Sequence, residues 1–113
     1  MTGDYIPERG DLVWVDLDVR AGPGRRAALV VSPLEYNRRI GLAQLCPVTS
    51  RVKGYPFEVL LPPGRGVEGV VLADQVRNLD WRERGAEKIS RVPAAVINEV
   101  TAKIAALLGP LRA

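Results

Sequence analysis

The chain has 113 residues, a formal net charge of +3 and a sequence pI near 9.4, which fit one domain with a mild preference for polyanionic partners. It contains no histidine and a single cysteine, so imidazole-dependent triads, imidazole zinc sites and an intrachain disulfide are excluded. We expect that cysteine, Cys46, to be a small buried apolar residue. With no signal-peptide pattern and no apolar stretch approaching about 18 residues, we expect a soluble cytoplasmic protein without a membrane partner.

Short strands, punctuated by 11 glycines and 9 prolines, are expected along most of the chain. The first, at 11–17, alternates so that Trp14 lies on the face opposite Val13 and Val15. A polar turn is expected at 36–39. Further strands are expected at 27–32, 42–48, 55–61 and 70–79, with a weaker one near 86–92.

The sequence period changes only near the C-terminus. Apolar residues from Val96 to Leu108 recur at spacings of three and four, which is typical of an amphipathic helix, and Pro93 suits its first turn. A Gly-Pro pair after the last apolar residue is a strong stop signal. Strands closed by one helix predict a single α+β domain over 1–113, built on a small antiparallel β-barrel or strongly curved sheet with the helix covering one end.

Two glycine-rich segments are candidates for binding anions. The segment 20–26 carries three arginines and two glycines, which suit a phosphate-binding loop and equally a solvated hairpin connection. The segment 64–69 matches the nucleotide-binding pattern G-x-G-x-x-G, but it lies between expected strands and opens no helix. We therefore do not expect a nucleotide there.

A rim of cationic and hydroxyl side chains follows from the expected strand order. If the strands at 27–32 and 42–48 pair antiparallel, the loop that enters the first and the loop that leaves the second meet, which brings Arg26 near Thr49. Cations beside hydroxyls suit a phosphodiester, although Thr49 and Ser50 also fit ordinary turn chemistry. The other members of this rim are Arg25, Arg51 and Lys53.

Five segments are recognisable when they are read together. GDLVWVD at 10–16, GRR at 24–26, VVSP at 30–33, KGYPFEV at 53–59 and LADQV at 72–76 resemble, in order and spacing, the MazF/PemK family of toxin endoribonucleases. The resemblance implies an SH3-like barrel with added helices, a homodimer, and cleavage of single-stranded RNA at short sequences without metal or another cofactor. It also implies that Arg26 and Thr49 form the catalytic pair, and that the products carry a cyclic phosphate and a free 5′-hydroxyl.

The chain departs from the family in its proton-transfer groups. The family commonly has Arg-Pro where Ala27 follows Arg26 here, and some members carry a loop glutamate where this chain has no acid from Val19 to Arg26. Arginine is too basic to accept a proton ordinarily, so we expect Arg26 to stabilise the phosphorane and assist the leaving oxygen, while Thr49 positions a phosphate oxygen. The general base stays unassigned, with Asp16, Asp18 and Asp74 as weak candidates.

Further side chains are candidates for holding the RNA. Gln75 and Asn37 can hydrogen-bond base edges, and Trp14 can stack on a base, with core packing as its alternative role. Arg20 is expected to be a solvated charge, whereas Tyr55, Phe57 and Trp81 are expected to pack. The complete set of RNA-binding candidates is Arg25, Ser50, Arg51, Lys53, Trp14, Asn37 and Gln75.

The resemblance also implies a partner, a MazE-like cognate antitoxin. Its acidic, disordered segment would lie along the toxin and compete with RNA for the same guanidinium groups. An alternative of a different class is a non-catalytic barrel that binds nucleic acid or poisons gyrase, as related barrels do. The match at Arg26 and Thr49 favours the enzyme, because a protein that only grips its partner does not need that pair.

Overall fold

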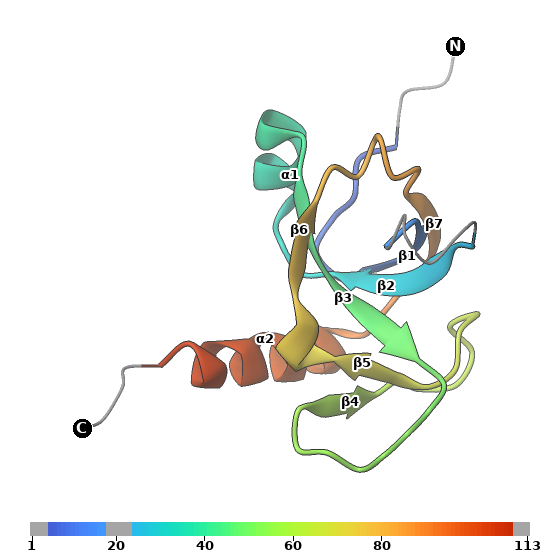
Figure 1. Ribbon diagram of the computed structural model, residues 1–113, viewed down its shortest axis with the longest axis vertical. Helices are drawn as coiled ribbons and strands as arrows, with labels where there is room; N and C mark the ends of the chain where they lie inside the picture. Colours follow the sequence, from blue (N-terminus) through green and yellow to red (C-terminus); the bar gives the residue numbers. More distant parts are fainter. Residues whose placement is uncertain (1–4, 18–23, 110–113) are drawn as a thin grey trace.

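The computed structural model describes residues 5–17 and 24–109, which form a curved antiparallel sheet with one short and one long helix (Figure 1). The helices are α1 (Leu34–Ile40) and α2 (Ala94–Leu107), and a 3₁₀ turn, η2, spans Ala73–Gln75. The expected α+β class with a C-terminal helix is confirmed. The strands are β1 (Asp11–Val15), β2 (Arg26–Val30), β3 (Ala43–Thr49), β4 (Glu58–Leu60), β5 (Val70–Leu72), β6 (Arg77–Leu79) and β7 (Glu87–Arg91).

Strand β3 is the centre of the sheet. The strand order is β4-β5-β3-β2-β1-β7, and β6 pairs with β3 off this path. One edge of β3 pairs antiparallel with β2, while its other edge pairs with β6 near its start and with β5 at its end. Among the described strands, the outer two, β4 and β7, do not pair with each other, so hydrogen bonds do not close the barrel-like sheet.

The two faces of the sheet bury separate apolar clusters. One cluster contains Leu12 from β1 and is covered by Val96 and Val100 of α2. The other contains Val13 from β1 and the indole of Trp81, which is only 3% exposed. The alternation expected along β1 and the packing role expected for Trp81 are therefore confirmed. Burial of both faces holds the strand ends that form the candidate site.

Cys46 lies on β3 within the first cluster and has no exposed surface, as expected. Burial raises the pKa of its thiol to about 12, with a smaller contribution from the negative charge of Asp74. The thiol therefore stays protonated at neutral pH and packs as a small apolar side chain.

The prediction of a polar turn at 36–39 is wrong, because these residues belong to α1. Pro33 occupies the N-cap, where its missing N–H has no cost, and Gly41 ends the helix with a φ of 80°. The N–H of Gly41 donates to the carbonyl oxygen of Asn37 at 3.1 Å. Ion pairs between the acidic first turn and the basic last turn support the exposed side of this short helix.

The strand expected over 70–79 is interrupted by η2. Strand β5 pairs with the end of β3 and β6 pairs with its start, so the chain must step along β3 between them. The N–H of Ala73 donates to the carbonyl oxygen of Phe57 at 3.2 Å, which fixes the step. The strand expected over 55–61 is likewise shorter and spans only 58–60. These irregular segments supply side chains to the site.

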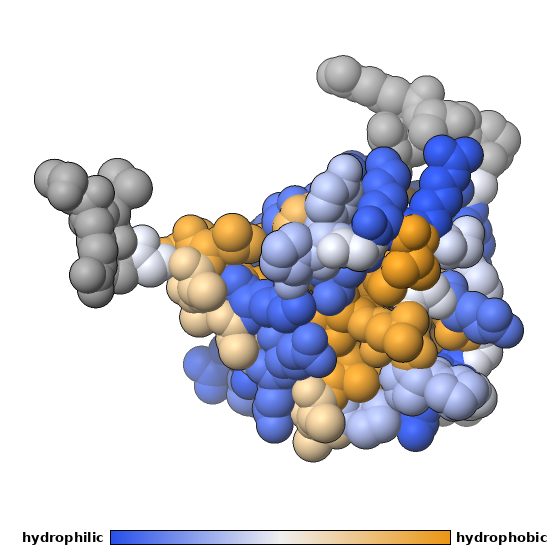
Figure 2. Space-filling model, turned by 90° about the horizontal axis from the view of Figure 1, so that it is seen from below, coloured by the Kyte–Doolittle hydropathy of each residue, from blue (hydrophilic) through white to orange (hydrophobic). Residues whose placement is uncertain are grey.

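The face seen from below in Figure 1 combines apolar and hydrophilic side chains (Figure 2). Large apolar side chains that remain exposed include Leu60 on β4, and Leu107 and Leu108 where α2 ends. Within the described ranges, no helix has the length and apolar character needed to cross a membrane.

Candidate functional site

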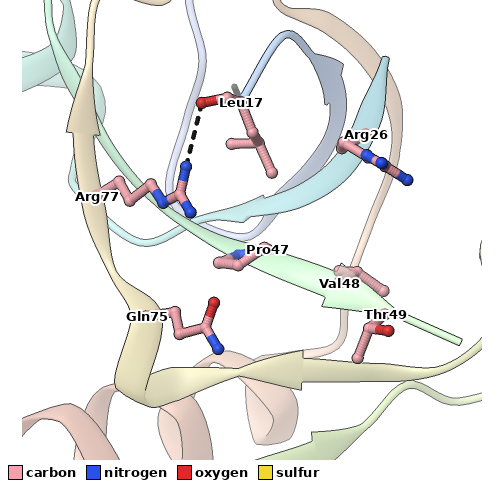
Figure 3. A pocket seen from close by; sticks show the side chains of 7 residues that line it. All are labelled: Leu17, Arg26, Pro47, Val48, Thr49, Gln75 and Arg77. Carbon is pink, nitrogen blue, oxygen red and sulfur yellow. Dashed lines mark hydrogen bonds between the residues drawn. The ribbon is translucent and has the colours of Figure 1, made fainter. Parts of the chain in front are cut away.

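A cavity of about 270 Å³ opens where the ends of β1, β2 and β3 approach the segment from η2 to β6 (Figure 3). Strands β2 and β3 run antiparallel with Ala28 opposite Pro47, which brings the start of β2 toward the end of β3, and Arg26 and Thr49 line the same cavity. The proximity expected from the sequence is therefore present. The described walls of the cavity are Leu17, Arg26, Pro47, Val48, Thr49, Gln75 and Arg77.

The hydroxyl of Thr49 has a defined direction. Its Oγ1 accepts the backbone N–H of Arg51 at 3.1 Å, in a turn that ends β3. That contact occupies an oxygen lone pair and leaves the hydroxyl proton for another acceptor. The turn chemistry and the functional role weighed for Thr49 are thus compatible, since the turn orients the hydroxyl.

Gly69 fixes the backbone of Thr49 from the opposite strand. It precedes β5, which pairs with β3 through Thr49 and Val70, and its φ is +127°. A Cβ at this position would overlap the carbonyl oxygen of Thr49 and crowd Ser50. The glycine-rich segment 64–69 therefore leads directly into a strand, as expected, and its last glycine allows the close approach that positions Thr49.

Arg77 is a member of the cavity that the sequence analysis missed. Its Nη1 donates to the carbonyl oxygen of Leu17 at 3.1 Å, which holds its guanidinium at the cavity wall (Figure 3). Gln75 reaches the same wall from η2. The sequence carried one usable signal, because residues two apart in the strand expected over 70–79 would share a face and Gln75 was already a candidate.

The described lining of the cavity carries two guanidinium groups and no carboxylate. Guanidinium groups donate paired hydrogen bonds to phosphate oxygens and neutralise their charge, while a hydroxyl and an amide can orient the remaining oxygens. The arrangement therefore suits one phosphodiester, and it would stabilise charge that develops on the phosphorus during substitution.

Comparisons with known proteins agree with this geometry. A family model described as the PemK-like, MazF-like toxin of a type II toxin-antitoxin system matches residues 8–108. The chain belongs to the PemK/MazF toxin family. The Escherichia coli K12 protein named endoribonuclease toxin MazF is 45% identical over 112 residues, which cover 96% of this chain and 100% of that protein.

Solved structures extend the match to the PemK/MazF fold. A MazE-MazF crystal structure from Deinococcus radiodurans is 56% identical, has a TM-score of 0.87 and covers 96% of this chain and 100% of that one. A MazF crystal structure from the same organism is 56% identical with a TM-score of 0.88, and covers 95% of this chain and 100% of that one. The resemblance drawn from the five sequence segments is confirmed.

The segment after β3 continues the candidate site beyond Thr49. Arg51 and Lys53 line a second pocket that shares Thr49 and Gln75 with the cavity. Ser50 is exposed and lines a separate groove on the other side of the segment. The structure therefore brings Arg51 and Lys53 to the site and places Ser50 at its margin.

Arg25 does not line the cavity, although it precedes Arg26. Its guanidinium forms an ion pair with Glu87 on β7 and donates to the carbonyl oxygens of Gly85 and Trp14. These contacts turn the side chain toward the β1-β7 edge of the sheet. An RNA phosphate would have to compete with Glu87 for this guanidinium.

Trp14 is 39% exposed, so the alternative of core packing is wrong. Its indole lies on the solvent side of β1, where a base could reach it, but it lines neither the cavity nor the second pocket. A role in RNA binding stays a prediction for Trp14.

Asn37 is wrong as an RNA-binding candidate. Its side chain is completely buried, and its Nδ2 donates to the carbonyl oxygens of Pro7 and Ser32 at 2.7 and 3.0 Å. Its Oδ1 accepts the hydroxyl of Ser32. With its amide engaged inside the chain, Asn37 has no group to offer a base and instead ties α1 to the segments before β1 and after β2.

The weak candidates for the general base do not line the cavity. Asp16 and Asp74 are both exposed, and neither belongs to the cavity wall. Asp18 and Arg20 lie outside the described residues. Over the ranges that the structure describes, no three His, Cys, Asp or Glu side chains gather as a metal site would require.

Proposed function

We propose that this chain is an endoribonuclease toxin of a type II toxin-antitoxin system, which cleaves single-stranded RNA without a metal ion. The observation that carries the proposal is the convergence of Arg26, Thr49 and Arg77 on one cavity. Membership of the PemK/MazF family, whose Escherichia coli relative is named an endoribonuclease toxin, supports the same activity. With mRNA as its substrate, the enzyme acts in the cytoplasm.

The residues present suit transesterification within the RNA. The ribose 2′-oxygen attacks the adjacent phosphorus, the bond from phosphorus to the 5′-oxygen breaks, and the products carry a cyclic phosphate and a 5′-hydroxyl. Arg26 and Arg77 neutralise the charge that grows on the phosphorane, and the Thr49 hydroxyl donates a hydrogen bond to a non-bridging oxygen. The 2′-hydroxyl loses one proton and the leaving oxygen gains one. Arg26 assists the second transfer.

The described cavity wall contributes charge stabilisation and no carboxylate for proton abstraction. The chain contains no histidine, so the pH dependence of cleavage should show no limb from an imidazole near pH 6.5. A limb near pH 6.5 would show that another titrating group takes part in proton transfer and would contradict this division of roles.

A direct test incubates the purified protein in EDTA with end-labelled RNA and with DNA of the same sequence. The proposal predicts RNA fragments that end in a cyclic phosphate and leaves the DNA intact, because DNA lacks the 2′-hydroxyl. Intact RNA together with inhibited gyrase supercoiling would instead support the non-catalytic alternative. Mapping the cleaved ends across one long RNA then identifies the recognised sequence.

The proposed partner is an acidic antitoxin. The solved Deinococcus radiodurans structure is a MazE-MazF complex, and the cationic lining of the cavity is complementary to acidic side chains. A groove of about 490 Å³ beside Ser50, lined in part by Val52 and Leu60, offers apolar surface to a segment of the antitoxin. A pulldown from native cells should return a small acidic protein that suppresses RNA cleavage. Recovery of none would count against this partner.

The proposed assembly is a homodimer. Exposed apolar side chains at Leu107 and Leu108 supply surface that association would bury. Light scattering on the purified protein should give twice the chain mass of 12.3 kDa, and a monomer at micromolar concentration would contradict the assembly.

A further inference from the structure

The second pocket, which adjoins the cavity, has the character of a nucleobase site. It encloses about 160 Å³ and shares Thr49 and Gln75 with the cavity, so a nucleotide next to the scissile phosphate can reach it. Its other walls include Lys53, Tyr55 and Glu58. Aromatic, cationic and hydrogen-bonding groups on one small pocket are what recognition of an unpaired base requires.

The aromatic wall is a stacked pair, not a core contact. The rings of Tyr55 and Phe57 have centroids 5.2 Å apart and planes inclined by 21°. Tyr55 nevertheless remains 50% exposed, so Phe57 supports the ring while much of its surface is free. The packing role expected for both residues therefore holds for Phe57, which is partly buried, and leaves Tyr55 unexplained.

The loop that carries Tyr55 is held in place on both sides. The carboxylate of Glu58 accepts the backbone N–H groups of Gly54, at 2.9 Å, and of Lys53. From α2, Lys103 donates to the carbonyl oxygens of Pro56 and Glu58. A ring on a tethered loop loses little freedom on binding, so stacking on it is effective.

We propose that this pocket binds one base of the RNA, stacked on Tyr55, at a position adjacent to the cleaved bond. Lys53 and Arg51 receive the neighbouring phosphate, and the edge of the base faces Glu58 and Gln75. Because an ionised carboxylate only accepts hydrogen bonds, the pocket favours bases with an amino group and disfavours uracil, whose single donor lies between two acceptors. The inference rests on the proposed endoribonuclease function and adds a specificity-determining site to it.

The test compares Tyr55→Ala with Tyr55→Phe, using Tyr36→Ala as the control for removing a partly exposed tyrosine ring elsewhere. We expect Tyr55→Ala to lower kcat/KM for a short single-stranded RNA about 5- to 150-fold, mainly through KM, which is the equivalent of one base stacked on an aromatic ring. Tyr55→Phe keeps the ring and should cleave at a rate near that of the wild type. Equal kcat/KM for Tyr55→Ala, Tyr36→Ala and wild type would overturn the inference.

A binding measurement separates this inference from the proposed function. Fluorescence anisotropy with 2′-O-methyl RNA, which cannot undergo the attack, should show weaker binding by Tyr55→Ala than by wild type. If the wild type binds this RNA through Tyr55 but cleaves no RNA, the base site stands and the endoribonuclease proposal fails. If the wild type cleaves RNA and Tyr55→Ala binds and cleaves as well as it does, only the base site fails.

The predicted base preference has its own test. Cleavage of RNAs that vary one base at a time should reveal a position beside the cut at which uracil is disfavoured. Glu58→Gln introduces an amide donor and should reduce this discrimination, with thermal unfolding as the check that the loop remains in place. Equal tolerance of all four bases by the wild type, or an unchanged preference in folded Glu58→Gln, would contradict the assigned edge contact.

Discussion

Two polar regions of this protein look alike in sequence and differ in structure: a buried region around Asn37 and an open region at the cavity. In the first, Asn37 is fully buried and its side-chain amide bonds to Ser32 and Pro7, while its backbone carbonyl oxygen accepts the indole N–H of Trp81 at 2.9 Å. In the second, Arg26 and Gln75 line the cavity, and neither side chain has a hydrogen-bond or ion-pair partner within the described ranges. A polar group satisfied inside the chain serves the fold, whereas one that faces a cavity with its donors open is available to a substrate.

The largest expected effect comes from Arg26 in the open region. Arg26→Lys keeps the charge and loses the fork of donors, so RNA cleavage should fall about 10²- to 10³-fold with little change in thermal stability. The control is Arg39→Lys, a change of the same kind at an exposed position on α1. Near-normal cleavage by Arg26→Lys would remove Arg26 from the mechanism.

The buried region should respond in the opposite way. Asn37→Ala leaves the carbonyl oxygens of Pro7 and Ser32 without their donor, and should lower the free energy of unfolding by about 2–4 kcal/mol. Cleavage by the folded fraction should stay within about twofold of wild type, since Asn37 does not reach the cavity. Chemical denaturation measures the first effect, with the exposed Asn78→Ala as the control. A selective loss of activity in stable Asn37→Ala would restore an RNA-binding role.

Gly69 should affect both stability and cleavage, because it is a structural residue that positions Thr49. Gly69→Ala and Gly64→Ala both place a side chain on a backbone of positive φ, at +127° and +84°. This backbone strain should lower the free energy of unfolding of each variant by about 1–3 kcal/mol. Only Gly69→Ala would also displace the Thr49 carbonyl, since nothing lies near a Cβ at Gly64. We expect about tenfold lower kcat in folded Gly69→Ala than in Gly64→Ala. Equal kcat values would show that Gly69 does not set the position of Thr49.

The smallest expected effect is on stability, which should be unchanged near neutral pH and should fall only in alkaline solution. Burial raises the pKa of Cys46 to about 12, and burial together with the hydrogen bond to Asp11 raises the pKa of Tyr5. A raised folded pKa means that the unfolded chain loses its proton first, so the free energy of unfolding should be constant below about pH 9 and decline as pH rises toward 12. Tyr5→Phe should decline less steeply in denaturation curves measured between these limits. A stability that rises with pH would contradict the burial of these groups.

The sequence predicted the features that follow from local residue patterns, and it missed those that depend on contacts between distant segments. Alternation along β1 and the apolar period of α2 gave the sheet and its covering helix, and antiparallel pairing was enough to bring Arg26 to Thr49. The helix α1 was missed because a run of polar residues conceals the Pro33 and Gly41 caps. Asn37 and Gln75 are equal as sequence candidates, and only their surroundings separate a satisfied amide from an open one. Arg77 was missed because the hydrogen bond to Leu17 that holds it at the cavity joins residues 60 positions apart, which no local pattern shows.

If Arg26 and Thr49 act on one phosphorus, a double-mutant cycle must show that their contributions to cleavage are coupled. Single-turnover cleavage of one RNA by wild type, Arg26→Lys, Thr49→Ala and the double variant gives the coupling between the two residues. We expect the double variant to cleave nearly as fast as the slower single variant, because either change disrupts the same stabilised transition state. Losses in rate that simply multiply would show that the two residues act independently and would rule out their joint action on the phosphorus.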